Sequence, residues 1–388
     1  MFDRLLPRLI APVLALGLAL GGAAAAQADT TPDAYAPKTG ALFNNPLGGF
    51  SEQRRLFIHI RRSISSVPPG GAVRIAVMSF ADKRIADALI AAHKRGVRVK
   101  LIFAGANVYP PMARLRDAIG TDASARSFVI ICEASCRGTK GQMHAKYFSF
   151  SRTAGGSSYV TMVGSNNLTK HNATEQWSDL YTVEGDRKYY RAYNKWFGEL
   201  KRDQPVEQQY IRRYIGDNQI SITPIDLSAN DDPIRTALTK VRCEVTRGEL
   251  DPDAKDPDEV VRTRIRIGAH AWNEERGKAI ARDVAGLINQ GCIVQVFYGV
   301  GTGPAVRAIL TQAGATLSNG THKGIHTHQK MMIIKGAYGK QLDTIRVWTG
   351  SHNWSDRAPG RDDLIVYTKN RAVGEAYVRG FKYMWRRG

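Results

Sequence analysis

The sequence lacks long hydrophobic runs after its first residues and has few cysteines. Beyond residue 28, no segment reaches the roughly 18 consecutive apolar residues that a membrane-spanning helix needs, so we expect the mature protein to be soluble. Four cysteines in 388 residues exclude a small scaffold held together by many disulfides. With 43% hydrophobic and 23% charged residues, the chain is neither disordered nor collagen-like, and its length predicts two or three domains.

Acidic residues are also scarce relative to basic ones. Asp and Glu number 35 against 55 Lys and Arg, which gives a formal net charge of +20. Such a charge attracts polyanions, namely nucleic acid, anionic membrane surfaces or acidic polymers. A solvated basic surface with no polyanionic partner is the alternative interpretation.

Residues 1–28 have the pattern of a signal peptide. Arg4 and Arg8 give a basic start, Leu9 to Leu20 are mostly apolar, and Ala26-Gln27-Ala28 fits the small-x-small rule for cleavage after Ala28. The sequence therefore predicts a secreted protein.

An exported chain can form disulfides, and four cysteines allow three pairings. We predict a short local bridge, Cys132–Cys136, and a longer one, Cys243–Cys292, within the second half. No CxxC pair occurs, so these cysteines do not predict a zinc site.

The chain contains an internal repeat. Val73 to Gly105 and Arg264 to Gly299 both read as strand, amphipathic helix, glycine and strand, with Gly96 and Gly291 expected to end the helices. Such units predict right-handed crossovers and parallel strand pairs. A second pair of blocks, QMHAKYFSF with VTMVGSNNLT and HTHQKMMIIKG with IRVWTGSHNWS, follows in the same order, so we interpret the chain as a duplicated α/β unit.

The repeat predicts the domain organisation. We expect a first lobe at residues 29–215, a linker at 216–233 and a second lobe at 234–388. Residues 249–259 carry six acidic residues among prolines and are expected to form an exposed insertion.

Each half carries a His-x-Lys pair, formed by His144 with Lys146 and by His328 with Lys330. The two-residue period of a strand places each pair on one face. Two cationic side chains repel unless an anion lies between them, so the repeated pair predicts a phosphate site. Lysine supplies charge for phosphoryl oxygens, and histidine supplies a nucleophile or a proton carrier near neutral pH.

Further polar residues follow each pair along the chain. A second strand ends in Gly-Ser-x-Asn, whose Ser and Asn are expected to donate to phosphate oxygens, and a carboxylate comes 10 to 12 residues later and is expected to orient a histidine. These residues are Ser165, Asn167 and Asp179 in the first half, and Ser351, Asn353 and Asp363 in the second.

The doubled HxK and GSxN motifs resemble those of the phospholipase D superfamily, whose signature is HxKxxxxD with GSxN downstream. The resemblance covers nearly all of the mature chain. It implies a duplicated phospholipase D-like fold with two α/β/α lobes. Each lobe has a mixed, largely parallel sheet, and a pseudo-twofold axis relates the lobes, with the active site at their interface. It implies no cofactor and no metal.

This sequence departs from the signature at one position in each half. The family's Asp is replaced by Ser151 and by Lys335. We expect that Asp to have a supporting role, so the replacements bear on loop stability and activity more than on the nucleophile.

The resemblance also implies a mechanism. One histidine attacks phosphorus to form a phosphohistidine, and the other protonates the leaving oxygen and then activates water. We assign His144 as the nucleophile and His328 as the acid/base, with the exchange of these roles left open. Lys146, Lys330 and the Ser and Asn residues above would stabilise the charge on the phosphoryl group.

The sequence thus predicts a secreted, monomeric phosphodiesterase that hydrolyses or transfers the headgroups of glycerophospholipids at a membrane surface. The alternatives are an extracellular endonuclease acting on nucleic acid, and a catalytically impaired basic binding protein. Among the other histidines, His171 and His352 are expected near the site and His270 at the surface or in helix packing. A metal cluster of His322, His326 and His328 is a further, less favoured interpretation.

Overall fold

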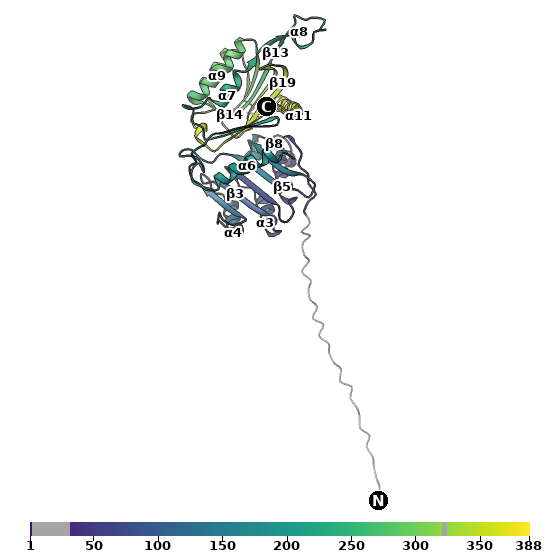
Figure 1. The fold of residues 1–388 in the computed structure, drawn as a ribbon, viewed down its shortest axis with the longest axis vertical. Helices are drawn as coiled ribbons and strands as arrows, with labels where there is room; N and C mark the ends of the chain where they lie inside the picture. The colour runs from purple at the N-terminus through teal and green to yellow at the C-terminus, as the bar shows by residue number, and fades with distance from the viewer. Residues whose placement is uncertain (2–31, 320–323) are drawn as a thin grey trace. The chain divides into compact units, whose positions relative to one another are not determined.

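The computed structural model describes residues 1, 32–319 and 324–388 (Figure 1). The expected signal peptide falls almost wholly on residues that are not described. Residues 32–388 form one unit. Within the described part of the chain, no helix is long and apolar enough to cross a membrane.

The first lobe is a seven-stranded sheet with helices packed against it. Its strands, in chain order, are β1 (Gly40–Phe43), β2 (Ala72–Val77), β3 (Arg98–Ala104), β4 (Phe128–Cys132), β5 (Lys146–Arg152), β6 (Ser158–Gly164) and β8 (Asp179–Val183). Its helices are α1 (Phe50–Gln53), α2 (Arg55–Ser65), α3 (Lys83–Lys94), α4 (Pro110–Ile119), α5 (Lys170–Glu175) and α6 (Arg187–Leu200). The short strand β7 (Gln176–Trp177) lies outside this sheet.

The second lobe is a nine-stranded sheet of the same design. Its strands are β9 (Ile211–Ile215), β10 (Asn218–Ile222), β11 (Val241–Arg242), β14 (Arg264–Trp272), β15 (Ile293–Thr302), β16 (Thr316–Ser318), β18 (Lys330–Tyr338), β19 (Gln341–Gly350) and β20 (Leu364–Thr368). Its helices are α7 (Pro233–Leu238), α8 (Arg247–Leu250), α9 (Glu274–Asn289), α10 (Pro304–Gln312), the 3-10 helix η2 (Ala358–Gly360) and α11 (Arg371–Arg387). The remaining strands are β12 (Glu244–Thr246), β13 (Val260–Arg262) and β17 (His326–Thr327).

The strand orders show the duplication. The first sheet runs β4-β3-β2-β5-β6-β8-β1, and the second runs β16-β15-β14-β18-β19-β20-β10-β9. The predicted strand–helix–strand units are confirmed, because β2 pairs with β3 and β14 with β15, both in parallel. Both sheets are mixed, but the expectation that they are largely parallel was wrong. In the described residues the parallel pairs of these two sheets are β2–β3, β3–β4, β14–β15 and β15–β16. The other pairs are antiparallel, because β5, β6 and β8 and their counterparts follow one another as hairpins and meanders.

Both glycines that were expected to end helices do so, and an acidic residue lies at the start of each of these helices. Gly96 and Gly291 have φ angles of 87° and 96°, a conformation that a side chain disfavours, and each ends its helix. Asp82 caps α3 by accepting a hydrogen bond from the Ile85 amide. Glu274 lies in the first turn of α9, and its carboxylate accepts from the Asp356 amide.

Three clusters of buried side chains form the core. One lies between the first sheet and helices α2, α3 and α4, and one between the second sheet and α7, α9 and α10. The third contains residues from both sheets together with Tyr193 and Trp196 of α6 and Tyr377 and Phe381 of α11. Helices α6 and α11 therefore lie in a shared layer that joins the two lobes through apolar packing.

The structure corrects the expected linker at residues 216–233. Strand β10 lies inside this segment and pairs with β20, and β9, which was expected to belong to the first lobe, pairs with β10. The second sheet therefore begins before residue 216. The expected exposed insertion at 249–259 is found between β12 and β13, where most side chains are exposed, and α8 projects from the lobe in Figure 1.

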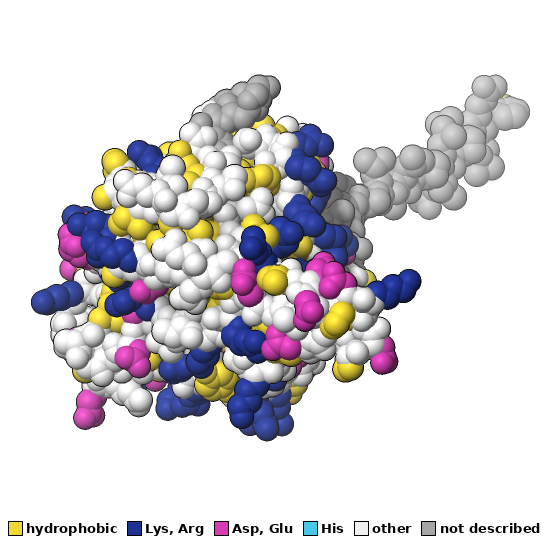
Figure 2. All heavy atoms as spheres, turned by 90° about the horizontal axis from the view of Figure 1, so that it is seen from above, with side chains coloured by type: hydrophobic (Ala, Val, Ile, Leu, Met, Phe, Trp, Pro, Cys, Tyr) yellow, Lys and Arg dark blue, Asp and Glu magenta, His cyan; other side chains and the backbone are white. Residues whose placement is uncertain are grey.

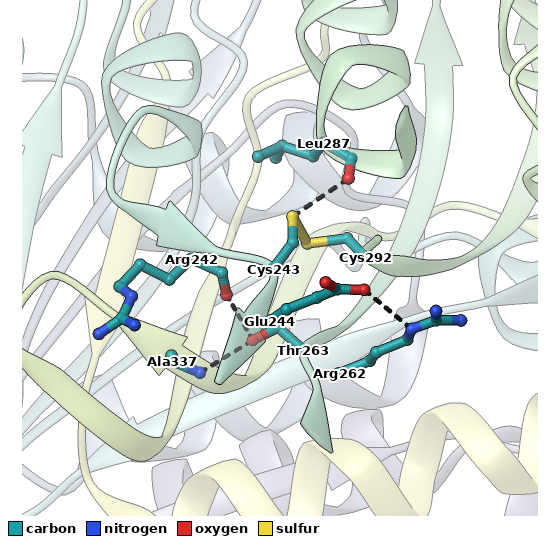
Figure 3. Close-up of a disulfide and its surroundings, with 8 residues drawn as sticks. All are labelled: Arg242, Cys243, Glu244, Arg262, Thr263, Leu287, Cys292 and Ala337. Carbon is teal, nitrogen blue, oxygen red and sulfur yellow. Dashed lines mark hydrogen bonds and ion pairs between the residues drawn. A yellow bond between two sulfur atoms is a disulfide. The ribbon is translucent and has the colours of Figure 1, made fainter. Parts of the chain in front are cut away.

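Both predicted disulfides are confirmed. Cys132 and Cys136 are bonded at the end of β4, and Cys243 is bonded to Cys292 at the start of β15. Figure 3 shows that the second bridge lies beside Thr263, whose hydroxyl donates to the Arg242 carbonyl (2.6 Å) and accepts from the Ala337 amide (2.9 Å). This bridge ties the chain before the insertion to the end of α9.

Candidate active site

The two HxK pairs occupy equivalent places. Lys146 and Lys330 are the first residues of β5 and β18, and each histidine lies two residues earlier. The Lys146 ammonium donates to the His144 carbonyl at 2.5 Å, and the Lys330 ammonium donates to the His328 carbonyl at 2.6 Å. The same sequence pattern thus produces the same local geometry twice.

Backbone pairing between the lobes brings the two pairs together. The His144 amide donates to the Asp362 carbonyl (3.0 Å), next to Asp363 of the second lobe. The His328 amide donates to the Trp177 carbonyl (2.8 Å), and β17 pairs in parallel with β7, close to Asp179 of the first lobe. Each HxK segment is therefore held by the chain that leads to the other lobe's carboxylate.

The two imidazoles are anchored differently. His144 Nδ1 lies 2.8 Å from Asp363 Oδ1, whereas His328 Nδ1 lies 2.7 Å from the Ser165 carbonyl oxygen. A carbonyl only accepts, so His328 must carry its proton on Nδ1, and a carboxylate favours the same tautomer in His144. Within the described residues, neither Nε2 atom forms a hydrogen bond, and the two residues are 5% and 6% exposed.

The carboxylates of Asp179 and Asp363 also have different hydrogen-bond partners. Asp179 accepts hydrogen bonds from the hydroxyls of Ser165 (2.7 Å), Thr349 and Tyr377 (2.9 Å). Asp363 accepts from the Ser351 hydroxyl and from His144, and its Oδ2 has no partner among the described residues. One carboxylate is thus enclosed by neutral donors, and the other faces an imidazole.

Burial and neighbouring charges shift the pKa values in opposite directions. Burial raises the pKa of Asp179, an effect that its hydroxyl donors only partly offset. Burial also acts to raise the pKa of Asp363, but the charge and hydrogen bond of His144 overcome it and hold the pKa below its usual range. Asp363 is therefore ionised at neutral pH.

The HxK groups have lowered pKa values. Burial lowers the pKa of His144 to about 4 and that of Lys146 to about 7. Burial and the charge of Lys146 lower the pKa of Lys330 well below its ordinary value. Burial is the main cause that lowers the pKa of His328. The positive charge of Lys330 lowers it further, and so does that of Lys146. Because Lys146 of one lobe acts on both groups of the other, the two pairs share one electrostatic environment that favours an anion.

The GSxN residues are placed beside the site, with roles that differ in part from those expected. Ser165 and Ser351 are fully buried, and their hydroxyls donate to carboxylates rather than pointing to an open position. A side chain at Gly164 or Gly350 would collide with the backbone of the neighbouring strand, which explains the glycine in each turn. The hydroxyls of Ser165 and Ser351 therefore hold the carboxylates of Asp179 and Asp363 in place.

Unpaired polar atoms lie at the same turns. The amide oxygens of Asn167 and Asn353 are buried and have no hydrogen-bond partner among the described residues. The same holds for the side-chain amide of Asn166 and for both ring nitrogens of His352, which occupy equivalent positions in the two turns. Buried polar groups normally find partners, so a bound ligand is a natural partner for these.

The residues that replace the family's aspartates lie further along the strands. The Ser151 hydroxyl accepts a hydrogen bond from the Ala72 amide (2.9 Å), and Lys335 forms an ion pair with Glu375 of α11 (3.2 Å). Ser151 thus links β5 to β2, and Lys335 links β18 to α11; among the described residues, neither side chain forms a hydrogen bond or an ion pair with an HxK group.

The sequence analysis missed His270. Its ring centroid lies 4.4 Å from that of His328, and its Nδ1 lies 3.1 Å from the Thr327 carbonyl oxygen. His270 is equivalent to Met78 of the first lobe, because their amides donate to the carbonyls of the equivalent residues Gln329 and Ala145, so the repeat itself carried no sign of a second histidine here.

Other residues near the site were also placed by the structure. Arg361 lowers the pKa values of His144 and Lys146 through its charge. His171 is exposed and pairs with Glu175 at 2.8 Å, with its ring 5.8 Å from that of His326. His322 of the less favoured metal cluster lies outside the described residues.

Comparison with known protein families finds a match to part of the first lobe. Residues 70–201 match the family model described as cardiolipin synthase, PLD-like domain. The chain contains a phospholipase D-like domain. The resemblance to the phospholipase D superfamily is thus confirmed. The matched segment covers most of the first lobe, including His144, Lys146 and Asp179, whereas the second HxK pair lies outside it.

Solved structures share the duplicated phospholipase D-like fold. Phosphatidylserine synthase from Haemophilus influenzae Rd KW20 aligns with a TM-score of 0.52 at 11% identity, covering 90% of this chain and 88% of that one. Polyphosphate kinase from Porphyromonas gingivalis aligns with a TM-score of 0.55 at 10% identity, covering 90% of this chain and 50% of that one. This chain therefore corresponds to about half the length of the kinase. Comparison with curated protein sequences finds no match.

Proposed function

We propose that this phospholipase D-like protein is an exported phosphodiesterase that cleaves the headgroup from a glycerophospholipid by way of a phosphohistidine. One observation carries the proposal. Two imidazoles, each anchored through Nδ1 to the opposite lobe, share a buried site with two lysines. Anchoring through Nδ1 leaves Nε2 of each ring as the reactive nitrogen.

The anchors assign the roles. The ionised carboxylate of Asp363 stabilises the positive charge that develops on His144 when its Nε2 attacks phosphorus, so His144 is the nucleophile. The bond from phosphorus to the headgroup oxygen breaks as the new P–N bond forms. His328 donates its Nε2 proton to that oxygen, then accepts a proton from the water or alcohol that cleaves the P–N bond.

The negative charge of the bound substrate allows His328 to become protonated and act as the acid. In the free site, burial and the lysines hold the pKa of His328 too low for it to carry a second proton. A bound phosphodiester anion offsets those positive charges and raises the pKa values of His328 and both lysines. The acid therefore forms when the substrate binds, and the lysines stabilise the additional charge of the transition state.

Lipid substrates are supported by the matching family model, whose description is a cardiolipin synthase, and by the fold shared with a phosphatidylserine synthase. The two disulfides and the leader-like first 28 residues support export. The charge excess of +20 supports the second candidate, an endonuclease. Figure 2 shows basic side chains scattered over the visible face with acidic ones among them, rather than one continuous basic groove.

The test compares wild-type protein with His144→Ala in the presence of a metal chelator. We expect the wild type to release choline from phosphatidylcholine vesicles and the variant to lose activity by at least about 10⁴-fold, as removal of a catalytic nucleophile does. Nicking of supercoiled DNA that falls steeply with salt would favour the endonuclease instead. If neither activity depends on His144, the chain is a binding protein on this scaffold.

A further inference from the structure

A cavity of about 600 Å³ lies at the junction of the lobes, lined by residues of β1, β7 and α11 among others. Its floor is apolar and aromatic, formed by Phe43 of β1, Trp177 of β7 and Tyr383 of α11. Trp177 and Tyr383 meet edge to face with their ring centroids 6.2 Å apart. Gly380 permits close packing of α11 on Phe43, since a Cβ there would lie 2.7 Å from the ring.

The rim of this cavity is cationic. Arg379, Lys382 and Arg386 lie at i, i+3 and i+7 on one exposed face of α11, and Arg55 of α2 lines the opposite lobe's side. Among the described residues, none of the three cations on α11 forms an ion pair within 4.0 Å. Their positive field is therefore available to a ligand.

One carboxylate also lines the cavity, but it is already engaged. Glu52 accepts hydrogen bonds from the Asn45 amide group (3.2 Å) and the Gly49 amide (3.1 Å), and it lies 4.0 Å from Arg55. These hydrogen bonds hold the pKa of Glu52 below its ordinary value. Counting Glu52 against the four cations leaves a net charge of +3 around an apolar floor.

We propose that this cavity binds an anionic amphiphile, with a phosphate-type headgroup at the rim of α11 and an acyl chain on the aromatic floor. An apolar floor beneath unpaired cations complements a ligand with both parts, whereas a small inorganic anion would leave the floor unused. The occupant would touch Gln329, which lines the cavity and stands between His328 and Lys330 in the chain. This site would hold the two lobes together by bridging Arg55 and α11.

The test is calorimetric titration with dodecyl phosphate below its micelle concentration. Excess inorganic phosphate is present to occupy the catalytic site. We expect saturable binding by the wild type and about tenfold weaker binding by Arg379→Ala/Lys382→Ala, the loss typical of two partly exposed charge contacts. The control is Lys94→Ala/Arg116→Ala, which removes the same charges from exposed positions on α3 and α4 and should bind like the wild type.

Three further probes separate the parts of the ligand. Inorganic phosphate alone tests the headgroup, dodecyl maltoside tests the chain, and AMP tests a nucleotide. Binding to this cavity is the part of each titration that Arg379→Ala/Lys382→Ala weakens and the control does not. The proposal predicts that, by this measure, dodecyl phosphate binds the cavity more tightly than all three. It is overturned if any of them binds the cavity as tightly, or if Arg379→Ala/Lys382→Ala binds dodecyl phosphate like the control. This result does not depend on whether the HxK site is active.

Discussion

The two halves of the candidate active site contain the same HxK and GSxN motifs, but their histidines have different hydrogen-bond partners. In one half, His144 faces the ionised carboxylate of Asp363. In the other half, His328 faces a backbone carbonyl, and Asp179 is enclosed by hydroxyls, among them those of Thr349 and Tyr377. The duplication supplied two equivalent histidines whose surroundings differ in charge and in hydrogen-bond partner, and the proposed unequal roles rest on this difference.

The strongest test of this difference is a matched pair of substitutions. Asp363→Asn replaces the carboxylate with an amide whose NH₂ group favours the wrong tautomer of His144. We expect a loss in kcat of roughly 10³–10⁴-fold. Asp179→Asn keeps one of the two acceptor oxygens for the hydroxyls and leaves the Nδ1 anchors of both histidines in place, so we expect a loss of about tenfold or less. Equal losses in steady-state assays of the two variants would contradict the assigned asymmetry.

The two disulfides offer a second comparison between the lobes. Removing Cys243–Cys292, which spans 49 residues, should lower the free energy of unfolding by about 4 kcal/mol, against about 2 kcal/mol for Cys132–Cys136, which spans 4. Double serine variants measured by denaturant unfolding would check these values.

For catalytic activity we expect the opposite order, with the larger effect from removing Cys132–Cys136. The Cys136 amide donates to the carboxylate of Asp362 (2.6 Å), whose backbone carbonyl holds His144. We therefore expect the Cys132→Ser/Cys136→Ser variant to lose more activity per kcal/mol of lost stability. If Cys243→Ser/Cys292→Ser proves the less active of the two when folded, this coupling is wrong.

Anion binding should depend on pH. The pKa of Lys146 is about 7 in the free site, and a bound anion raises it, so the bound state holds more protons. Affinity for sulfate, an anion that does not titrate in this range, should then fall by up to about tenfold per pH unit above pH 7, with net proton uptake on binding. Calorimetry in buffers of different ionisation enthalpy measures this uptake, and proton release would contradict it.

The smallest expected effect concerns Thr349, which the first lobe replaces with Val163 at the equivalent position before the Gly-Ser turn. Thr349→Val removes one hydroxyl donor to the buried carboxylate of Asp179. We expect a loss of about 1–3 kcal/mol in the free energy of unfolding and little change in kcat. A large fall in kcat with unchanged stability would show that Asp179 acts directly in the reaction.

The sequence predicted the features that depend on local or repeated patterns. The strand–helix–strand units, the glycine helix ends and both disulfides followed from such patterns. It could not predict which lobe holds which histidine, because the bond between His144 and Asp363 spans 219 residues and depends on how the lobes pack. His270 was missed for a related reason, since a histidine at the end of a strand is informative only once the strands are placed.

The expected linker failed on physical grounds as well. Residues 216–233 are polar and contain proline, which is typical of a connection. Strand β10 nevertheless lies between β20 and β9 in the sheet and buries Ile220 and Ile222 in the shared core. Gln219 and Ser221 of this strand lie on its other face.

The central claim is that His144 is the nucleophile and His328 the acid/base. Bis(p-nitrophenyl) phosphate tests it directly, because its leaving group needs no proton, and the His328→Ala variant lacks the base that would hydrolyse the intermediate. Quenching that variant with acid-free denaturant and mapping the adduct by mass spectrometry should place the phosphoryl group on His144. An adduct on any other residue, or none in a variant that still releases p-nitrophenol in a burst, would contradict the account.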